Sequence, residues 1–114
     1  MCNKEKLKKV TDDVVKAVLL VSKKVDKIIL YGSQARGDST EGSDIDILVL
    51  VDEPKEALYK LKKAMWRYTN EISLQQDEVV SLVLKNAADY NSMRHTLFYT
   101  NVARDGIELY GRAG

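Results

Sequence analysis

Cysteine, proline and histidine are nearly absent from this 114-residue sequence, which has one of each. The single cysteine, Cys2, cannot form an internal disulfide, and no stretch rich in glycine, serine or proline marks a linker between domains. No apolar run is long enough to cross a membrane, and the amino terminus lacks the apolar stretch and cleavage site of a secretory signal. We therefore expect one soluble, cytoplasmic domain over residues 1–114, without membrane contact.

A dominant charge of one sign is also missing, because 18 Lys and Arg residues face 17 Asp and Glu residues. The chain thus has no global basic field of the kind that drives non-specific nucleic-acid binding, and a nucleic-acid partner is not indicated. Its hydrophobic fraction of 45% and charged fraction of 31% are ordinary for a globular protein. A chain of this length can bury a core without disulfides or a structural metal.

Apolar periodicity predicts alternating helices and strands. An amphipathic pattern over residues 4–24 predicts a helix, and the apolar runs 27–31 and 45–51 predict buried strands. The remaining predicted elements are a helix from Pro54 to about residue 75, a strand over 78–84, a helix over 90–106 that ends at a C-terminal glycine, and a short strand over 107–110. This order predicts an α/β fold with a small sheet.

Two aspartates lie at the start of the second apolar run. Asp44 and Asp46 are two residues apart, so in a strand both side chains leave the same face. Neighbouring carboxylates at the edge of an apolar sheet repel each other and lose hydration unless a positive group neutralises them. Mg²⁺ prefers oxygen ligands and is usually held by one or two carboxylates together with substrate phosphates. The pair therefore predicts a metal site that also holds a nucleoside triphosphate.

A glycine and a serine directly follow the first predicted strand. Gly32 lets the backbone turn sharply and approach a ligand closely, and Ser33 adds a hydroxyl donor. If residues 34–36 open a helical turn, their free N–H groups form an anion site to which Arg36 can add positive charge. An ion pair with a nearby aspartate is an equally good role for Arg36. Since two metal ions can activate an attacking oxygen and stabilise a leaving pyrophosphate, the combination predicts nucleotidyl transfer.

The spacing of these residues resembles a known signature. Gly32-Ser33, ten further residues and then Asp44-Ile45-Asp46 resemble the motif of polymerase-β-type nucleotidyltransferases. The longer string GSQARGDSTEGSDIDILV is similar to their smallest members, the minimal nucleotidyltransferases. The resemblance implies a polymerase-β-like fold, with a mixed sheet and helices packed on one face. It also implies ATP as substrate, two Mg²⁺ ions on the aspartates and the triphosphate on the glycine-serine pair.

The resemblance further implies a third carboxylate from a following strand, which joins one of the metal ions. We predict Asp77 for this role because it opens the third strand, so that Asp44, Asp46 and Asp77 form the catalytic, metal-binding set. Glu78 is the rival candidate, and Glu71 is further behind. No separate catalytic base is visible.

The partner also follows from the resemblance. Many minimal nucleotidyltransferases resemble antitoxins that are encoded beside a HEPN ribonuclease and silence it by transferring AMP to one of its tyrosines. We therefore expect an antitoxin that adenylylates a hydroxyl of a HEPN-type protein partner, and that forms a homo- or hetero-oligomer. Two alternatives remain open: transfer to an RNA end or a small molecule, and a non-catalytic binding antitoxin with a vestigial metal site. The missing basic groove argues against the first, and the intact aspartate pair against the second.

Overall fold

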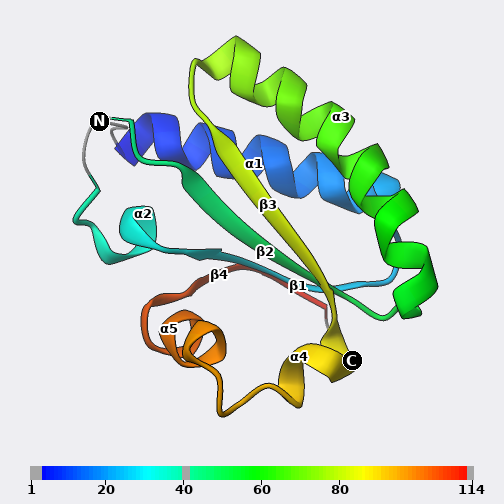
Figure 1. Ribbon diagram of the computed structural model, residues 1–114. Helices are drawn as coiled ribbons and strands as arrows, with labels where there is room; N and C mark the ends of the chain where they lie inside the picture. Colours follow the sequence, from blue (N-terminus) through cyan, green and yellow to red (C-terminus); the bar gives the residue numbers. More distant parts are fainter. Residues whose placement is uncertain (1–3, 40–41, 113–114) are drawn as a thin grey trace.

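A four-stranded mixed sheet forms the centre of the protein (Figure 1). The computed structural model describes residues 4–39 and 42–112. Across the sheet the strand order is β3-β2-β1-β4, with β1 antiparallel to β2 and β4, and β2 parallel to β3. The strands are β1 (Val25–Tyr31), β2 (Ile45–Val51), β3 (Val80–Asn86) and β4 (Ile107–Gly111). The predicted mixed sheet is confirmed, with β3 beginning two residues later than expected.

Two long helices, α1 and α3, lie on the same face of the sheet (Figure 1). A single 3-10 turn, η1, separates Pro54 from α3. Within the described residues, no helix is long and apolar enough to cross a membrane. The helical elements are α1 (Lys4–Val21), α2 (Ser33–Arg36), η1 (Lys55–Ala57), α3 (Leu58–Gln76), α4 (Ala87–Asn91) and α5 (Leu97–Asp105).

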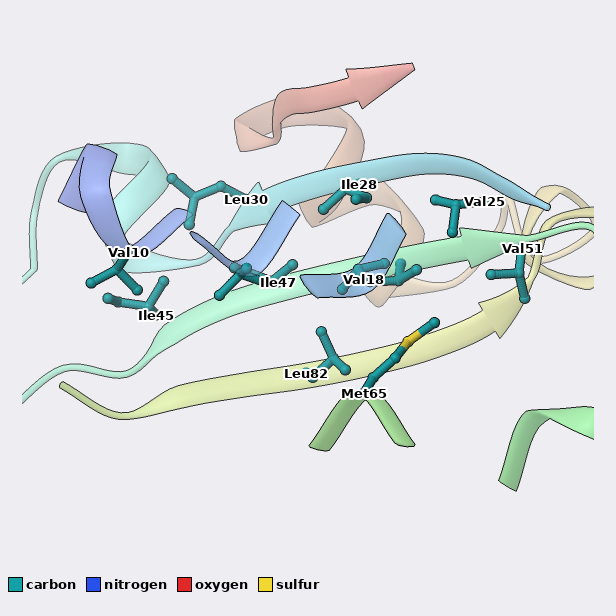
Figure 2. Packing of buried hydrophobic residues seen from close by; sticks show 12 residues of the cluster. Val10, Val18, Val25, Ile28, Leu30, Ile45, Ile47, Val51, Met65 and Leu82 are labelled. Atoms are coloured by element: carbon teal, nitrogen blue, oxygen red, sulfur yellow. The ribbon is translucent and has the colours of Figure 1, made fainter. Parts of the chain in front are cut away.

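The main core lies between the sheet and the α1–α3 layer (Figure 2). Val14 of α1, Met65 of α3 and Ile47 of β2 are fully buried in it. Burial of an aliphatic side chain stabilises the fold by about 1.5–3 kcal/mol, so this layer fixes the sheet on which the candidate site lies. Further buried members are Val10, Val18, Val25, Ile28, Leu30, Ile45, Val49, Val51 and Leu82.

A second apolar cluster covers the opposite face of the sheet. It joins Leu48 and Leu50 of β2 to Tyr90 of α4 and Val102 of α5. The prediction that helices pack on one face is therefore right for α1 and α3 but incomplete, because α4 and α5 pack against the other face. The physical reason is the apolar run of β2, whose residues 47–51 are all buried and require cover on both sides.

The predicted helix over residues 90–106 is divided into α4 and α5. Thr96 accepts a hydrogen bond from the Tyr99 amide (3.3 Å) and so begins α5 as its N-cap. Gly106 does end α5 as predicted, but its φ of −64° and ψ of 139° are extended rather than left-handed. Its small size matters instead, because a Cβ there would lie 2.8 Å from Ile29 Cγ2.

Candidate active site

The turn after β1 depends on a glycine. Gly32 has φ 76° and ψ −159°, a backbone region that is essentially restricted to glycine. This conformation directs the chain from Tyr31 into α2, the short helix Ser33–Arg36. The Gly32 carbonyl accepts hydrogen bonds from the amides of Ala35 and Arg36 (both 3.1 Å). The predicted helical turn after the glycine is thus present, and the first amides of such a turn have no partner within it.

The same glycine lies against the second aspartate of the motif. A Cβ on Gly32 would collide with Asp46 Oδ2 and lie 3.3 Å from Asp46 Cγ. Tyr31, the residue before the glycine, is also the direct Cα partner of Asp46 across the β1–β2 ladder. The antiparallel pairing of β1 and β2 therefore brings the predicted phosphate-binding turn and the predicted metal ligand into contact.

The two aspartates occupy different environments. Asp44 is exposed just before β2, whereas Asp46 is half-buried within the strand. Burial raises the pKa of the Asp46 carboxyl above its usual value, the charge of Asp44 raises it further, and Arg36 lowers it. The structure thus brings the pair close enough for mutual repulsion, as the sequence predicted. Two carboxylates beside the predicted phosphate-binding turn fit a divalent cation that completes its shell with phosphate oxygens and water.

Arg36 is positioned by two acidic neighbours. Its Nε lies 3.1 Å from Asp38 Oδ2, and its Nη1 lies 3.7 Å from Asp105 Oδ2 at the end of α5. Hydrogen bonding to Arg104, with a smaller contribution from Arg36, lowers the pKa of the Asp105 carboxyl. The predicted ion pair with a nearby aspartate is therefore present, and the guanidinium remains within electrostatic range of Asp46.

Two side chains that the sequence did not single out support this site. Tyr31 packs edge-on against Phe98 of α5, with ring centroids 5.4 Å apart, and burial together with Asp46 raises the pKa of its phenol to about 12. Gln34 is buried in α2, and its Nε2 donates a hydrogen bond to the Ser43 carbonyl (3.5 Å), which ties α2 to the segment before Asp44. In the sequence the signal for Gln34 was only a polar residue beside the Gly32-Ser33 pair.

Asp77 lies at the end of α3, three residues before β3 begins at Val80. It ends α3 in a left-handed conformation (φ 54°, ψ 45°) and its amide donates to the Ser73 carbonyl. Together with Glu78 it lines an open groove of about 700 Å³ beside α1 and α3, which extends to Ser43. Within residues 4–39 and 42–112 no three His, Cys, Asp or Glu side chains are placed to hold one metal ion, so the metal role of Asp77 stays a prediction.

Comparison with known proteins shows the family to which the chain belongs. The sequence model of the nucleotidyltransferase domain matches residues 7–94. Two Methanocaldococcus jannaschii proteins, both provisionally named protein adenylyltransferases, are each 33% identical to the chain. The first match spans 90 residues, which are 79% of this chain and 84% of the relative. The second spans 87 residues, which are 76% of this chain and 80% of the relative.

Solved structures with the same fold include both single enzymes and complexes. A toxin–antitoxin crystal structure with AMP-PNP superposes with a TM-score of 0.62 at 25% identity, over 90% of this chain and 73% of the other. A nucleotidyltransferase, also provisionally named, from Sulfolobus solfataricus gives a TM-score of 0.65 at 19% identity, over 95% and 86%. An MNT antitoxin with a tri-AMPylated HEPN toxin from Shewanella oneidensis gives 0.54 at 21% identity, over 93% and 73%. The chain belongs to the nucleotidyltransferase domain family and has its polymerase-β-like fold.

Proposed function

We propose that the chain transfers AMP from ATP to a hydroxyl group of a partner protein, with Mg²⁺ held by Asp44 and Asp46. The observation that carries this proposal is the contact between the Gly32 backbone and the Asp46 carboxylate. This contact puts the proposed phosphate-binding turn and the proposed metal ligand at one point, which supports triphosphate chemistry. In this proposal Ser33 and Arg36 also contact the triphosphate.

The reaction is an in-line displacement at the α-phosphorus of ATP. A bond forms between the acceptor oxygen and this phosphorus while the bond to the β-phosphate bridging oxygen breaks, so pyrophosphate leaves and the hydroxyl proton passes to solvent. Bound divalent ions would neutralise the triphosphate and lower the barrier to attack. The chain itself orients the reactants: Gly32 allows close approach, and the α2 amides bind phosphate oxygens.

A protein acceptor suits the exposure of this site. Asp44 is exposed, and the open groove that passes Ser43 leaves room beside it for a polypeptide segment. The provisional names of the two M. jannaschii relatives support adenylyl transfer to protein. The toxin–antitoxin complex with AMP-PNP supports a nucleotide-binding antitoxin, and we propose a HEPN-type toxin as the partner, with Mg²⁺ as the metal.

The first experiment measures nucleotide binding by isothermal titration of AMP-PNP into the purified chain with Mg²⁺ present. We expect binding by the wild type and none by the double variant Asp44→Ala, Asp46→Ala. Asp52→Asn is the matched control, because this aspartate lies exposed just beyond the far end of β2 and should bind as the wild type does.

Transfer is then tested with α-labelled ATP and a purified HEPN protein encoded by a neighbouring gene. Label on the HEPN protein that requires both aspartates would support adenylylation, and mass spectrometry would identify the modified hydroxyl. If nucleotide binding and labelling both fail even with the partner present, the enzyme proposal is wrong and a binding antitoxin that acts by steric contact remains. Label on RNA instead would favour the polymerase-like alternative.

A further inference from the structure

The strand beside Asp46 carries a serine level with it. β3 runs parallel to β2, and Ser81 is the direct Cα partner of Asp46. Partners on neighbouring strands present their side chains on the same face of a sheet. Val83, two residues after Ser81, packs in the same cluster as Leu48, two residues after Asp46, and this fixes the shared face. The residue of β3 on the Asp46 face therefore offers a neutral hydroxyl.

The acidic residues that precede β3 lie beside α1 and α3. Glu78 pairs with Lys6 of α1 at 3.4 Å, and its side chain is largely buried in that layer. Asp77 is the helix-ending residue of α3 and lines the groove on the same side. Neither carboxylate joins Asp44 and Asp46 in a three-ligand group among the described residues. Among the described residues the site thus offers the carboxylates of Asp44 and Asp46 to a divalent ion, without a third.

The number of charged ligands decides how tightly such a site binds a divalent ion. Divalent cations bind oxygen ligands more tightly as the number of carboxylates rises, while a neutral hydroxyl adds little. With Asp44 and Asp46 as its only carboxylates in the described part of the chain, the site requires further anionic oxygens to hold an ion firmly. The triphosphate of the proposed substrate supplies these oxygens.

We propose that Ser81 occupies the third ligand position of the metal site, so that divalent ions bind this chain tightly only together with a triphosphate. The proposal rests on the metal-dependent function proposed above and assigns an order to it: metal and nucleotide enter as one complex. A carboxylate at position 81 would convert the site into one that binds the ion by itself.

The test is a titration with Mn²⁺, followed by the paramagnetic resonance of the free ion, with and without AMP-PNP. The wild type should bind Mn²⁺ weakly alone and more tightly with AMP-PNP. Ser81→Asp should bind Mn²⁺ alone at least about tenfold more tightly than the wild type. Asp77→Asn is the control and should leave Mn²⁺ binding unchanged, because in this proposal Asp77 is not a ligand of the metal.

Two results would overturn the proposal. The first is a folded Ser81→Asp variant, verified by circular dichroism, that binds Mn²⁺ no more tightly than the wild type. The second is a loss of Mn²⁺ binding in Asp77→Asn, which would make Asp77 the third ligand.

A nearly isosteric variant covers the case in which Ser81→Asp does not fold. Ser81→Cys in a Cys2→Ser background places one thiol at the position, and Cd²⁺ should then give a thiolate-to-metal absorption band in the ultraviolet. The band should disappear when Asp46→Asn is added, and its absence from Ser81→Cys itself would contradict the proposal. Tight Mn²⁺ binding by Ser81→Asp, together with a wild type that transfers no adenylyl group to its partner, would support the metal position and refute only the proposed function.

Discussion

Gly32 combines two constraints in one residue: a backbone conformation restricted to glycine and contact with the Asp46 carboxylate. We expect Gly32→Ala to lower the free energy of unfolding by about 1–3 kcal/mol and to weaken AMP-PNP binding, because the new methyl group must displace the carboxylate. Urea unfolding and calorimetry measure the two effects. Gly37→Ala is the matched control, since Gly37 also has a positive φ (82°) but a Cβ there meets nothing within 4 Å. It should lose stability and keep nucleotide binding; equal loss of binding would contradict the role of Gly32.

Asp46 should make stability depend on pH. Its pKa is raised in the folded chain, so between the ordinary aspartate value and the raised value the folded state binds more protons than the unfolded state. The free energy of unfolding therefore falls as pH rises through this window. Asp46→Asn removes the decrease and should be modestly more stable than the wild type at neutral pH, because the carboxylate is half-buried, yet unable to bind nucleotide. Thermal melts across the acidic range would show this, and parallel curves for the two proteins would contradict it.

The central residues of this site were predictable from the sequence. Gly32, Asp44 and Asp46 are fixed by local facts: a glycine after a strand and two acids at the start of an apolar run. The third ligand position that we propose was not predictable, because it depends on the register between β2 and β3, which are joined through the whole of α3. A shift of one residue in that register changes which side chain faces Asp46. For this reason the sequence indicated Asp77, whereas the pairing places Ser81 beside Asp46.

At the scale of elements, one side chain joins the β2–α3 loop to the end of β3. Asn86 Nδ2 donates to the Glu53 carbonyl (2.7 Å), and its Oδ1 accepts from the Asp89 amide (3.0 Å), which caps α4. Asn86→Ala should cost about 1–3 kcal/mol of unfolding free energy in urea, because it removes a cap and leaves a carbonyl unpaired. Exposed Asn101 of α5 is the control, and its alanine variant should stay within about 0.5 kcal/mol of the wild type. Equal effects would show that the loop does not need this link.

The division between α4 and α5 also shows a limit of periodicity. Residues 92–96 contain neither glycine nor proline, so the helical pattern appeared continuous from Tyr90 to Val102. The break arises from side chains that hydrogen-bond to nearby backbone, including Thr96 and Ser92, and from the need to bring Phe98 over Tyr31. The packing of Phe98 against Tyr31 is a tertiary contact, so the periodicity of the sequence did not reveal it.

For the whole molecule, ligand binding should appear as thermal stability. A saturating complex of AMP-PNP and Mg²⁺, at about 100 times its Kd, adds about 2.7 kcal/mol to the free energy of unfolding, which corresponds to a rise in Tm of roughly 10 °C. EDTA should cancel the rise, because the triphosphate and the two carboxylates then repel each other. The double variant Asp44→Asn, Asp46→Asn should show no rise in either condition. A rise that persists in EDTA would place the nucleotide away from the aspartates.

The position of β4 has a consequence for how the chain is made. Residues 107–111 pair with β1, which begins only at Val25, so one edge of an early strand stays open until nearly the whole described chain has left the ribosome. Ile29 and Tyr31 of this early strand also pack in the cluster to which α5 contributes Val102. Nascent chains stalled before residue 107 should therefore expose this edge to chaperones or to another copy of the protein, whereas chains that extend past it should close the sheet by themselves.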